Sequence, residues 1–335
     1  MRDEAEYKGD SKAGGLGARR CRDAEGGSVT ICDVAPRDGL QNEEKHLDPG
    51  TRAELVNRLA AAGVPRIEAV SFVSPKWVPQ MAGAEEVVAG IDRREGVVYA
   101  GLVLNERGYD RLVATGLDEV HVAFAATESF NRRNQNASPE ESLAAAAAIV
   151  DRAHADKIRA TVTVGVSFGC PFEGAVDPER VLGFVSDIAA AGADEVVLAD
   201  TVGVGVPRQV KHLVSEAVKL APRVGVHLHN TRNTGFANAY AALEAGATVL
   251  DASVGGLGGC PYAPGASGNV ATEDLVYMLE GMGIRTGVDI DKLIAASGLA
   301  STLVGHEMPS KFYRAYVGSG LVGGAGAAGR ARSQG

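Results

Sequence analysis

The sequence predicts an α/β protein of the (β/α)8 barrel class. A helical stretch that ends in Ala-x-Gly and leads into a β-branched run occurs near residues 61, 114 and 190, and a fourth copy ends in Glu-Ala-Gly at 244–246. Apolar runs of this kind alternate with helical segments within about 250 residues, the usual length of the fold. No Gly-x-Gly-x-x-Gly motif follows the first run, which disfavours the rival doubly wound sheet.

The expected elements follow one another in strand–helix order. Each repeated glycine suits the left-handed position just after a helix, and the β-branched run after it suits a short buried strand. We expect strands at residues 28–34, 66–70, 97–104, 118–124, 160–167, 194–199, 223–228 and 248–253. Helices are expected between them, for example at 51–62, 139–155, 178–191, 207–220 and 234–245.

One structured domain is expected in the 335 residues. Residues 1–27 are polar and glycine-rich, which predicts a disordered N-terminal tail. The barrel should occupy residues 28–315, and the Gly/Ala-rich stretch 316–335 should be a flexible C-terminal tail.

Composition argues against several classes of function. A net charge of −9 disfavours nucleic-acid binding, because phosphate contacts need a basic surface. No apolar run reaches membrane-spanning length, and no apolar stretch after Met1 suggests a signal peptide. The acidic residues near the N-terminus disfavour a mitochondrial presequence. The four cysteines form no Cys-x-x-Cys pair and predict free thiols in a reducing compartment. We expect a cytoplasmic protein that acts on a small molecule, and a homo-oligomer, taken as a dimer.

Polar side chains gather where the expected strands end, which is the catalytic face of a (β/α)8 barrel. His227 and His229 are two residues apart on a strand, so both imidazoles point toward the barrel interior. Asp38, after the first strand, supplies a carboxylate. Two imidazoles, a carboxylate and an amide oxygen favour Mg²⁺ or Mn²⁺ over structural zinc. A hydrogen-bonded pair of core histidines is the alternative.

Charged residues beside this set suggest catalysis at the same place. Arg37 suits either a salt bridge at the rim or the stabilisation of an oxyanion. Glu68 lies on an otherwise apolar strand, so it needs a partner such as Arg37 or the metal ligands. Arg132 and Arg133 follow the fourth strand and are either solvated or in contact with an anionic ligand.

The loop at residues 255–269 combines six glycines and two prolines with Cys260. Glycine lets a backbone lie close to a ligand, and proline stiffens the segment between glycines. A thiol in such a loop is a candidate for chemistry, and a surface loop with an incidental cysteine is the alternative.

Long motifs in the chain resemble those of the 3-hydroxy-3-methylglutaryl-CoA lyase family. They are DVAPRDGLQNE at 33–43, IEAVSFVSPKWVPQM at 67–81, GCPFEG at 169–174, DTVG at 200–203, and the glycine loop through NVATEDL at 269–275. The resemblance covers roughly residues 28–310. It implies a metal-dependent barrel lyase, in the superfamily of isopropylmalate and homocitrate synthases, that cleaves an acyl-CoA by a retro-Claisen step to acetyl-CoA and acetoacetate.

The resemblance also implies roles by position. Asp38, His227, His229 and Asn269 would bind Mg²⁺ or Mn²⁺, and the substrate would meet Arg37, Gln41, Ser71, Asn134 and Thr201. The catalytic residues would be Arg37, Glu68, Asp200 and Cys260. Arg37 would stabilise an enolate oxygen, and Cys260 would protonate the enolate carbon. Asp38 or His227 would relay the proton of the substrate hydroxyl.

One segment departs from the family pattern. Where the family commonly has Asp-Thr-Tyr-Gly after the second histidine, this chain has NTRNTG at 230–235. Arg232 puts a cation where an aromatic is usual, which leaves the acyl group open. Alternatives are a lyase for a related 3-hydroxyacyl-CoA such as citramalyl-CoA, a Claisen condensing synthase, or an inactive CoA- or metal-binding protein.

Overall fold

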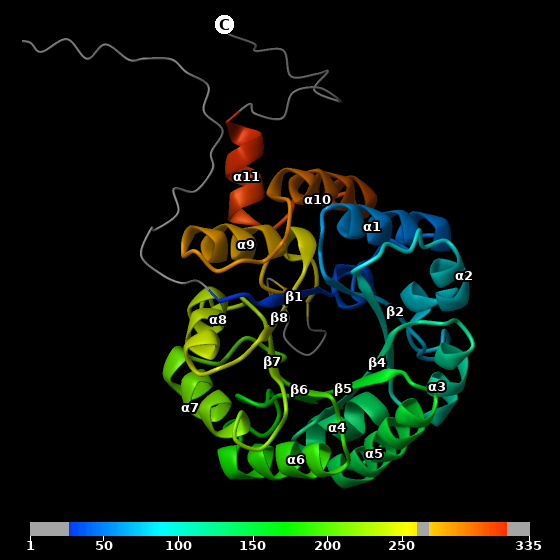
Figure 1. Cartoon of the computed structure of the whole chain (residues 1–335), viewed down its shortest axis with the longest axis vertical. Coiled ribbons are helices and arrows are strands. Elements are labelled where there is room, and N and C mark those ends of the chain that lie inside the picture. The colour runs from blue at the N-terminus through cyan, green and yellow to red at the C-terminus, as the bar shows by residue number, and fades with distance from the viewer. Residues whose placement is uncertain (1–26, 260–267, 320–335) are drawn as a thin grey trace, which may run out of the picture.

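Parallel strands form a closed barrel in which each strand pairs with the next and β8 pairs with β1 (Figure 1). The computed structural model describes residues 27–259 and 268–319. Helices surround the barrel on its outside (Figure 1). The predicted (β/α)8 barrel is confirmed, and the doubly wound alternative is wrong because that sheet would be open.

Strands and helices alternate along the chain as expected. The strands are β1 (Thr30–Asp33), β2 (Arg66–Ser71), β3 (Val98–Val103), β4 (Glu119–Ala125), β5 (Arg159–Gly165), β6 (Glu195–Asp200), β7 (Val224–Leu228) and β8 (Val249–Ala252). The helices are α1 (Pro49–Ala61), α2 (Ala84–Ala89), α3 (Glu106–Val113), α4 (Glu128–Gln135), α5 (Pro139–Ala155), α6 (Pro178–Ala190), α7 (Pro207–Ala217), α8 (Gly235–Glu244), α9 (Thr272–Gly281), α10 (Ile290–Val304) and α11 (Lys311–Gly318). Short helical turns lie at η1 (Ala35–Gly39), η2 (Pro79–Met81) and η3 (Val254–Gly256).

The recurring glycines lie just after helices, as predicted. Gly63, Gly116, Gly192 and Gly246 have φ of 81°, 72°, 92° and 101°, the left-handed region that glycine enters at little cost. A side chain at Gly63 would also place its β-carbon 2.8 Å from the carbonyl oxygen of Gly287. These glycines therefore end each helix sharply and return the chain to the barrel.

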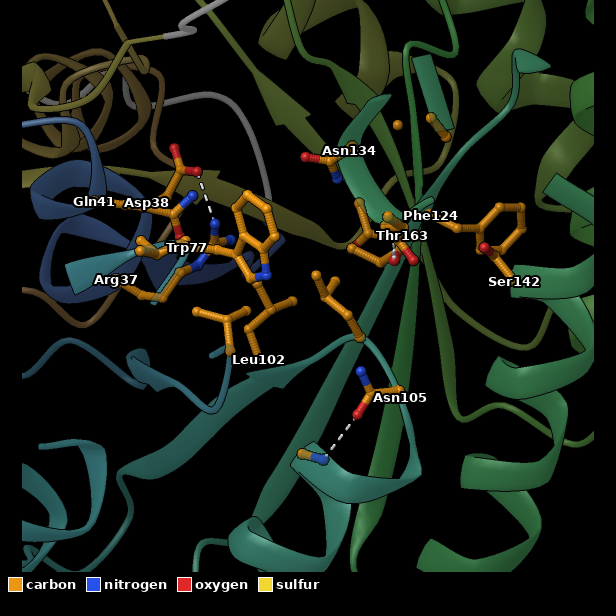
Figure 2. A pocket seen from close by; sticks show the side chains of 18 of the residues that line it. Arg37, Asp38, Gln41, Trp77, Leu102, Asn105, Phe124, Asn134, Ser142 and Thr163 are labelled. Carbon is orange, nitrogen blue, oxygen red and sulfur yellow. Dashed lines mark hydrogen bonds and ion pairs between the residues drawn. The ribbon is translucent and has the colours of Figure 1, made fainter. Parts of the chain in front are cut away.

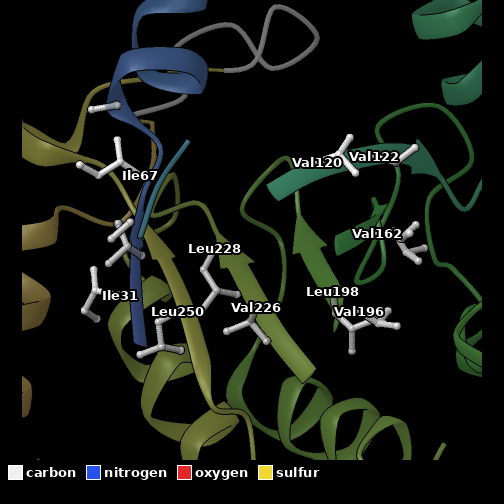
Figure 3. Close-up of a cluster of buried hydrophobic side chains, with 14 of the residues drawn as sticks. Ile31, Ile67, Val120, Val122, Val162, Val196, Leu198, Val226, Leu228 and Leu250 are labelled. Carbon is white, nitrogen blue, oxygen red and sulfur yellow. The ribbon is translucent and has the colours of Figure 1, made fainter. Parts of the chain in front are cut away.

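The two faces of the barrel wall differ in polarity because successive side chains of a strand point to opposite sides. Outward residues such as Ile67, Val162 and Leu228 belong to the apolar layer between strands and helices (Figure 3). Arg66 and Glu68 flank Ile67 in the sequence of β2 and are also buried, yet they face the barrel interior. Apolar packing against the helices therefore stabilises the outer face of the barrel wall, and polar side chains can occupy the barrel interior.

Helices α9, α10 and α11 follow the last strand, with α10 against α1 and α11 against α9 (Figure 1). Ser310 caps α11 by accepting the N–H of Tyr313 at 3.1 Å. Residues 316–318 are therefore helical rather than part of a tail that begins at 316. The rest of the predicted tails lies almost wholly outside the described residues. None of the helices described is long and apolar enough to cross a membrane.

Candidate active site

A cavity of about 1580 Å³ opens where the strands end, at the face predicted from the sequence. Its lining includes side chains from the turns after β1 and β7 and from the inner faces of β4, β5 and β6. Arg37 and Asp38 lie on one side of it, and Asn134 and Thr163 on the other (Figure 2). The cavity therefore joins residues that are far apart in the sequence.

The turn η1 places Arg37 and Asp38 at this cavity. Asp33, buried at the end of β1, accepts the backbone N–H of Ala35 at 2.9 Å and the hydroxyl of Thr272 at 2.7 Å. These bonds fix the start of the turn to β1 and to α9. The charged pair is consequently held by buried structure rather than by a free loop.

Three of the predicted metal ligands converge. The ligand atoms of Asp38, His227 and His229 all lie within 4.8 Å of one another. The fourth, Asn269, forms an antiparallel bridge with His229 and donates its Nδ2–H to Asp38 Oδ2 at 2.7 Å. The predicted set is thus brought together from η1, from the end of β7 and from the far end of the glycine loop.

Charge and burial shift the pKa values of these three groups in different directions. Burial alone would raise the pKa of Asp38, but Arg37 and the two imidazoles outweigh it and lower that pKa to about 2. Burial, aided by the neighbouring His227, lowers the pKa of His229 to about 4. Burial also acts to lower the pKa of His227, yet its hydrogen bond to Asp251 and the charge of Asp38 leave that pKa raised.

The donor set fits a divalent cation. Asn269 Oδ1 is buried and has no hydrogen-bond partner among residues 27–259 and 268–319, and the same is true of His229 Nδ1. Together with the Asp38 carboxylate these atoms form a mixed nitrogen and oxygen set without thiolate, which suits Mg²⁺ or Mn²⁺. The alternative of hydrogen-bonded core histidines fits only one of the two, because His227 contacts Asp251 whereas Nδ1 of His229 has no partner in those ranges.

Arg37 links the metal ligands to a second buried carboxylate. Its Nη1 donates to Asp38 at 2.8 Å, and its Nε donates to Glu68. Glu68 is 2 % exposed and also contacts Nδ1 of His121. Burial would raise the pKa of Glu68, but Arg37 and His121 lower it to about 2. The partner predicted for Glu68 is therefore confirmed.

Asp200 lies apart from the cavity lining, although it was predicted to be catalytic. Its two carboxylate oxygens accept the backbone N–H groups of Val204 and Gly205, both at 2.9 Å. The neighbours Ala199 and Thr201 line the cavity instead. Since side chains alternate along a strand, Asp200 faces the loop after β6. Its contacts here anchor that loop, and a catalytic role stays a prediction.

Only some of the residues predicted to bind substrate line the cavity. Gln41, Asn134 and Thr201 line the cavity beside Arg37. Ser71 is fully buried at the end of β2 and does not belong to the lining. Cys260 lies outside the residues that the structure describes.

The arginines singled out from the sequence have partners. Arg132 pairs with Glu128 at 2.5 Å, and Arg133 stacks at 4.1 Å on the Phe172 ring, and both line the cavity. Arg232 donates to the carbonyls of Val202 and Gly203 at 2.9 and 3.0 Å. Because Arg232 is absent from the lining, it holds a neighbouring loop rather than contacting the cavity.

Sequence reasoning missed His121 and Asp251. Asp251 on β8 lies opposite His227 in the strand register and is 3.2 Å from its Nδ1. Such a carboxylate orients a metal-binding imidazole. An acidic residue within the apolar run 248–253 was the available signal. For His121, the signal was its place two residues after Glu119 on a strand.

The known proteins to which this chain is similar agree with the family that its motifs resemble. A family model described as HMGL-like matches residues 28–300. The (R)-citramalyl-CoA lyase of Chloroflexus aurantiacus is 46 % identical over 295 residues, which are 84 % of this chain and 93 % of that protein. The mitochondrial hydroxymethylglutaryl-CoA lyase of Mus musculus is 44 % identical over 289 residues, 86 % of this chain and 89 % of the mouse protein.

A solved structure is similar over the same region. It is an HMG-CoA lyase from Acinetobacter baumannii in complex with coenzyme A and 3-methylmalate. Its TM-score is 0.83 at 41 % identity, and the alignment covers 86 % of this chain and 95 % of that one.

Proposed function

Since the chain belongs to the HMGL-like family and is a carbon–carbon lyase, we propose that it cleaves 3-hydroxy-3-methylglutaryl-CoA to acetyl-CoA and acetoacetate. The observation that carries this proposal is the cluster of Asp38, His227 and His229 beside the Arg37–Glu68 pair in one cavity. Relatives that bear this activity, at 44 % identity over most of the chain, support the choice of substrate.

Asp38, His227, His229 and Asn269 would hold Mg²⁺ or Mn²⁺. A divalent cation there would polarise the hydroxyl and carboxylate oxygens of the substrate and make the hydroxyl more acidic. Asp251 would keep the His227 ring oriented through its contact with Nδ1. Arg37 offsets the negative charge of Asp38, so the site would not repel an anionic substrate.

The bond-breaking step needs a base, a stabilised enolate and an acid. Asp38 or His227 takes the proton of the tertiary hydroxyl, and the carbinol carbon becomes a ketone as its bond to the thioester α-carbon breaks. The electron pair passes to the thioester enolate, whose oxygen Arg37 stabilises. Cys260 then donates a proton to the enolate carbon as general acid. Gln41, Asn134 and Thr201 would position the acyl group.

The second candidate is cleavage of citramalyl-CoA, which the 46 % identity to a citramalyl-CoA lyase favours. That thioester has the same tertiary alcohol, but its free carboxylate is one methylene closer to the alcohol carbon. The same step would yield acetyl-CoA and pyruvate. A site that accepts one spacing of hydroxyl and carboxylate would turn over the other more slowly.

Incubation of the purified protein with Mg²⁺ and each thioester separates the two candidates. Acetoacetate from 3-hydroxy-3-methylglutaryl-CoA supports the first choice. Pyruvate from citramalyl-CoA, with no acetoacetate from the other thioester, refutes it in favour of the second. Omission of the metal, or Mn²⁺ in its place, tests the cofactor.

Two variants test the residue roles. Asp38→Asn should weaken metal binding and turnover together, whereas Cys260→Ala should lower kcat strongly and leave metal affinity unchanged. Full turnover by Cys260→Ala would exclude the acid role. Glu54→Gln is the matched control for charge, because Glu54 lies on the surface in a pair with Arg58. Size-exclusion chromatography with light scattering tests the expected homodimer.

A further inference from the structure

A line of alternating charges runs along the inside of the barrel and ends at the candidate active site. We call it the axial ion chain. In spatial order its members are Arg223, Glu195, Arg66, Glu119, His121, Glu68, Arg37 and Asp38. Each member contacts the next as an ion pair, and positive and negative groups alternate throughout if His121 is charged.

The lower part of the axial ion chain lies at the N-terminal ends of the strands. Arg223 Nε is 3.5 Å from Glu195 Oε2, and Arg66 Nη1 is 2.7 Å from Glu195 Oε1. Arg66 Nε is in turn 3.3 Å from Glu119 Oε2. Glu195 and Glu119 are fully buried, so neither carboxylate has water to replace a lost partner.

His121 joins the lower part to the active site. Its Nε2 is 3.7 Å from Glu119 Oε1, and its Nδ1 contacts Glu68 Oε2. The other oxygen of Glu68 accepts from Arg37, which lines the cavity. His121 is thus the one member of the axial ion chain whose charge depends on protonation near neutral pH.

The surroundings of His121 favour its charged form. Glu68 on β2 and Glu119 on its own strand face its two nitrogens, while Arg66 and Arg37 lie beyond these carboxylates. A neutral imidazole carries one N–H, and the axial ion chain would then hold four carboxylates against three arginines. Burial acts to lower the pKa of His121, but the contacts with Glu119 and Glu68 outweigh it and raise that pKa to about 10.

We propose that His121 is a positioning residue for the lyase reaction: as an imidazolium it holds the Glu68 carboxylate in the orientation that fixes the Arg37 guanidinium at the cavity. The role follows from geometry, because Glu68 uses one oxygen for His121 and the other for Arg37. The inference rests on the proposed function, since Arg37 acts there on the enolate oxygen. His121 itself does not line the cavity.

Steady-state kinetics with Mg²⁺ and 3-hydroxy-3-methylglutaryl-CoA test this role. His121→Gln should lower kcat at least about tenfold, because catalysis depends on the orientation of Arg37, and should change KM less than about threefold. The matched control is His154→Gln, since His154 forms an exposed pair with Asp194 at 3.3 Å. A kcat for His121→Gln equal to that of the control would overturn the proposal.

A double variant separates positioning from simple stabilisation. In Glu119→Gln/His121→Gln both groups lose their charge, so three arginines face three carboxylates over the whole axial ion chain, while Glu68 still lacks its contact with His121. The double variant should regain melting temperature relative to His121→Gln but keep the low kcat. Recovery of both quantities would show a merely structural role and refute positioning.

The charge of His121 can be measured without substrate or metal. In ¹⁵N-labelled wild-type protein, the imidazole that disappears in His121→Gln should show the doubly protonated shift pattern at pH 7 to 8. If that variant does not fold, two-dimensional assignment of the wild type serves instead. A neutral ring at pH 7 would overturn the inference. Wild-type protein that is folded but cleaves neither thioester would refute the proposed function alone.

Discussion

Glu195→Gln should destabilise the barrel strongly although it changes one oxygen to one nitrogen. Glu195 is fully buried and receives both Nη1 and Nη2 of Arg66, at 2.7 and 3.1 Å. Arg66 is 3 % exposed, so the variant leaves a guanidinium inside the barrel with Glu119 as its remaining anion. Loss of one partner from a buried pair costs about 3–5 kcal/mol.

We expect the lower end of that range, about 3 kcal/mol, because Glu119 still balances Arg66 and the glutamine carbonyl still accepts a hydrogen bond. Larger domains lose roughly 2–4 °C of melting temperature per kcal/mol, so Tm should fall by about 6 °C or more. Urea unfolding followed by circular dichroism measures the free energy, and differential scanning calorimetry measures Tm.

The matched control is Glu54→Gln, which removes the same charge from α1. Glu54 pairs with Arg58 at 2.6 Å, but the two side chains are 47 % and 59 % exposed, so the loss should be at most about 1 kcal/mol. If the two variants lose equal stability, burial of the barrel ion pairs does not decide their contribution, and the reasoning fails.

Three further predictions concern the site and its supports. Gly258 has φ of 120°, and a β-carbon there would lie 2.5 Å from Asn269 Nδ2. Gly258→Ala should therefore displace Asn269 and lower the affinity for Mg²⁺ about tenfold or more, as measured by titration calorimetry. An unchanged affinity would contradict this prediction. Glu273 has its pKa raised by burial to about 7, so it favours folding below about pH 4.5 and loses that contribution as pH rises through 7. Wild type should accordingly lose stability relative to Glu273→Gln over that range in urea titrations, and parallel curves would exclude the effect. Arg232→Ala removes bonds to two carbonyls and should cost about 1–3 kcal/mol, with KM for the thioester unchanged; a large rise in KM would place Arg232 in substrate binding after all.

The fold could be predicted because its signals are local. A glycine after four of the helices and an apolar run after each of these glycines lie within ten residues of one another, and they indicate where a helix ends and the next strand begins. Helix α5 begins and ends where the sequence indicates, since Ser138 and Glu141 form a capping box at its start. The predicted start of the C-terminal tail, residue 316, falls inside α11, a helix of only eight residues that the sequence pattern did not indicate.

The metal ligands could be predicted in part for the same reason. His227 and His229 reveal their common direction by spacing alone, and Asp38 follows β1, which only β8 separates from β7. The contacts of Asp200 could not be read this way, because its direction depends on where β6 ends within a single residue. The direction of the Ser71 side chain, which is buried and does not line the cavity, could not be predicted for the same reason.

His121 and Asp251 were missed because their partners are distant. Glu68 precedes His121 by 53 positions, and the contact forms only when β2 and β4, on either side of β3, both point these side chains into the barrel interior. Asp251 meets His227 through the pairing of β7 with β8. No local pattern encodes such contacts, although an ionisable residue inside an apolar strand signals that a partner exists.

The alternation of side chains along the strands makes this barrel suited to acquiring new substrates. Ala123 and Thr163 line the cavity, while the preceding residues Val122 and Val162 pack beneath the helices. A gene library that randomises only the cavity-lining positions of β4 and β5 would vary ligand preference without touching the helix contacts. Selection for another acyl group could therefore proceed by single substitutions that leave the unfolding temperature almost constant.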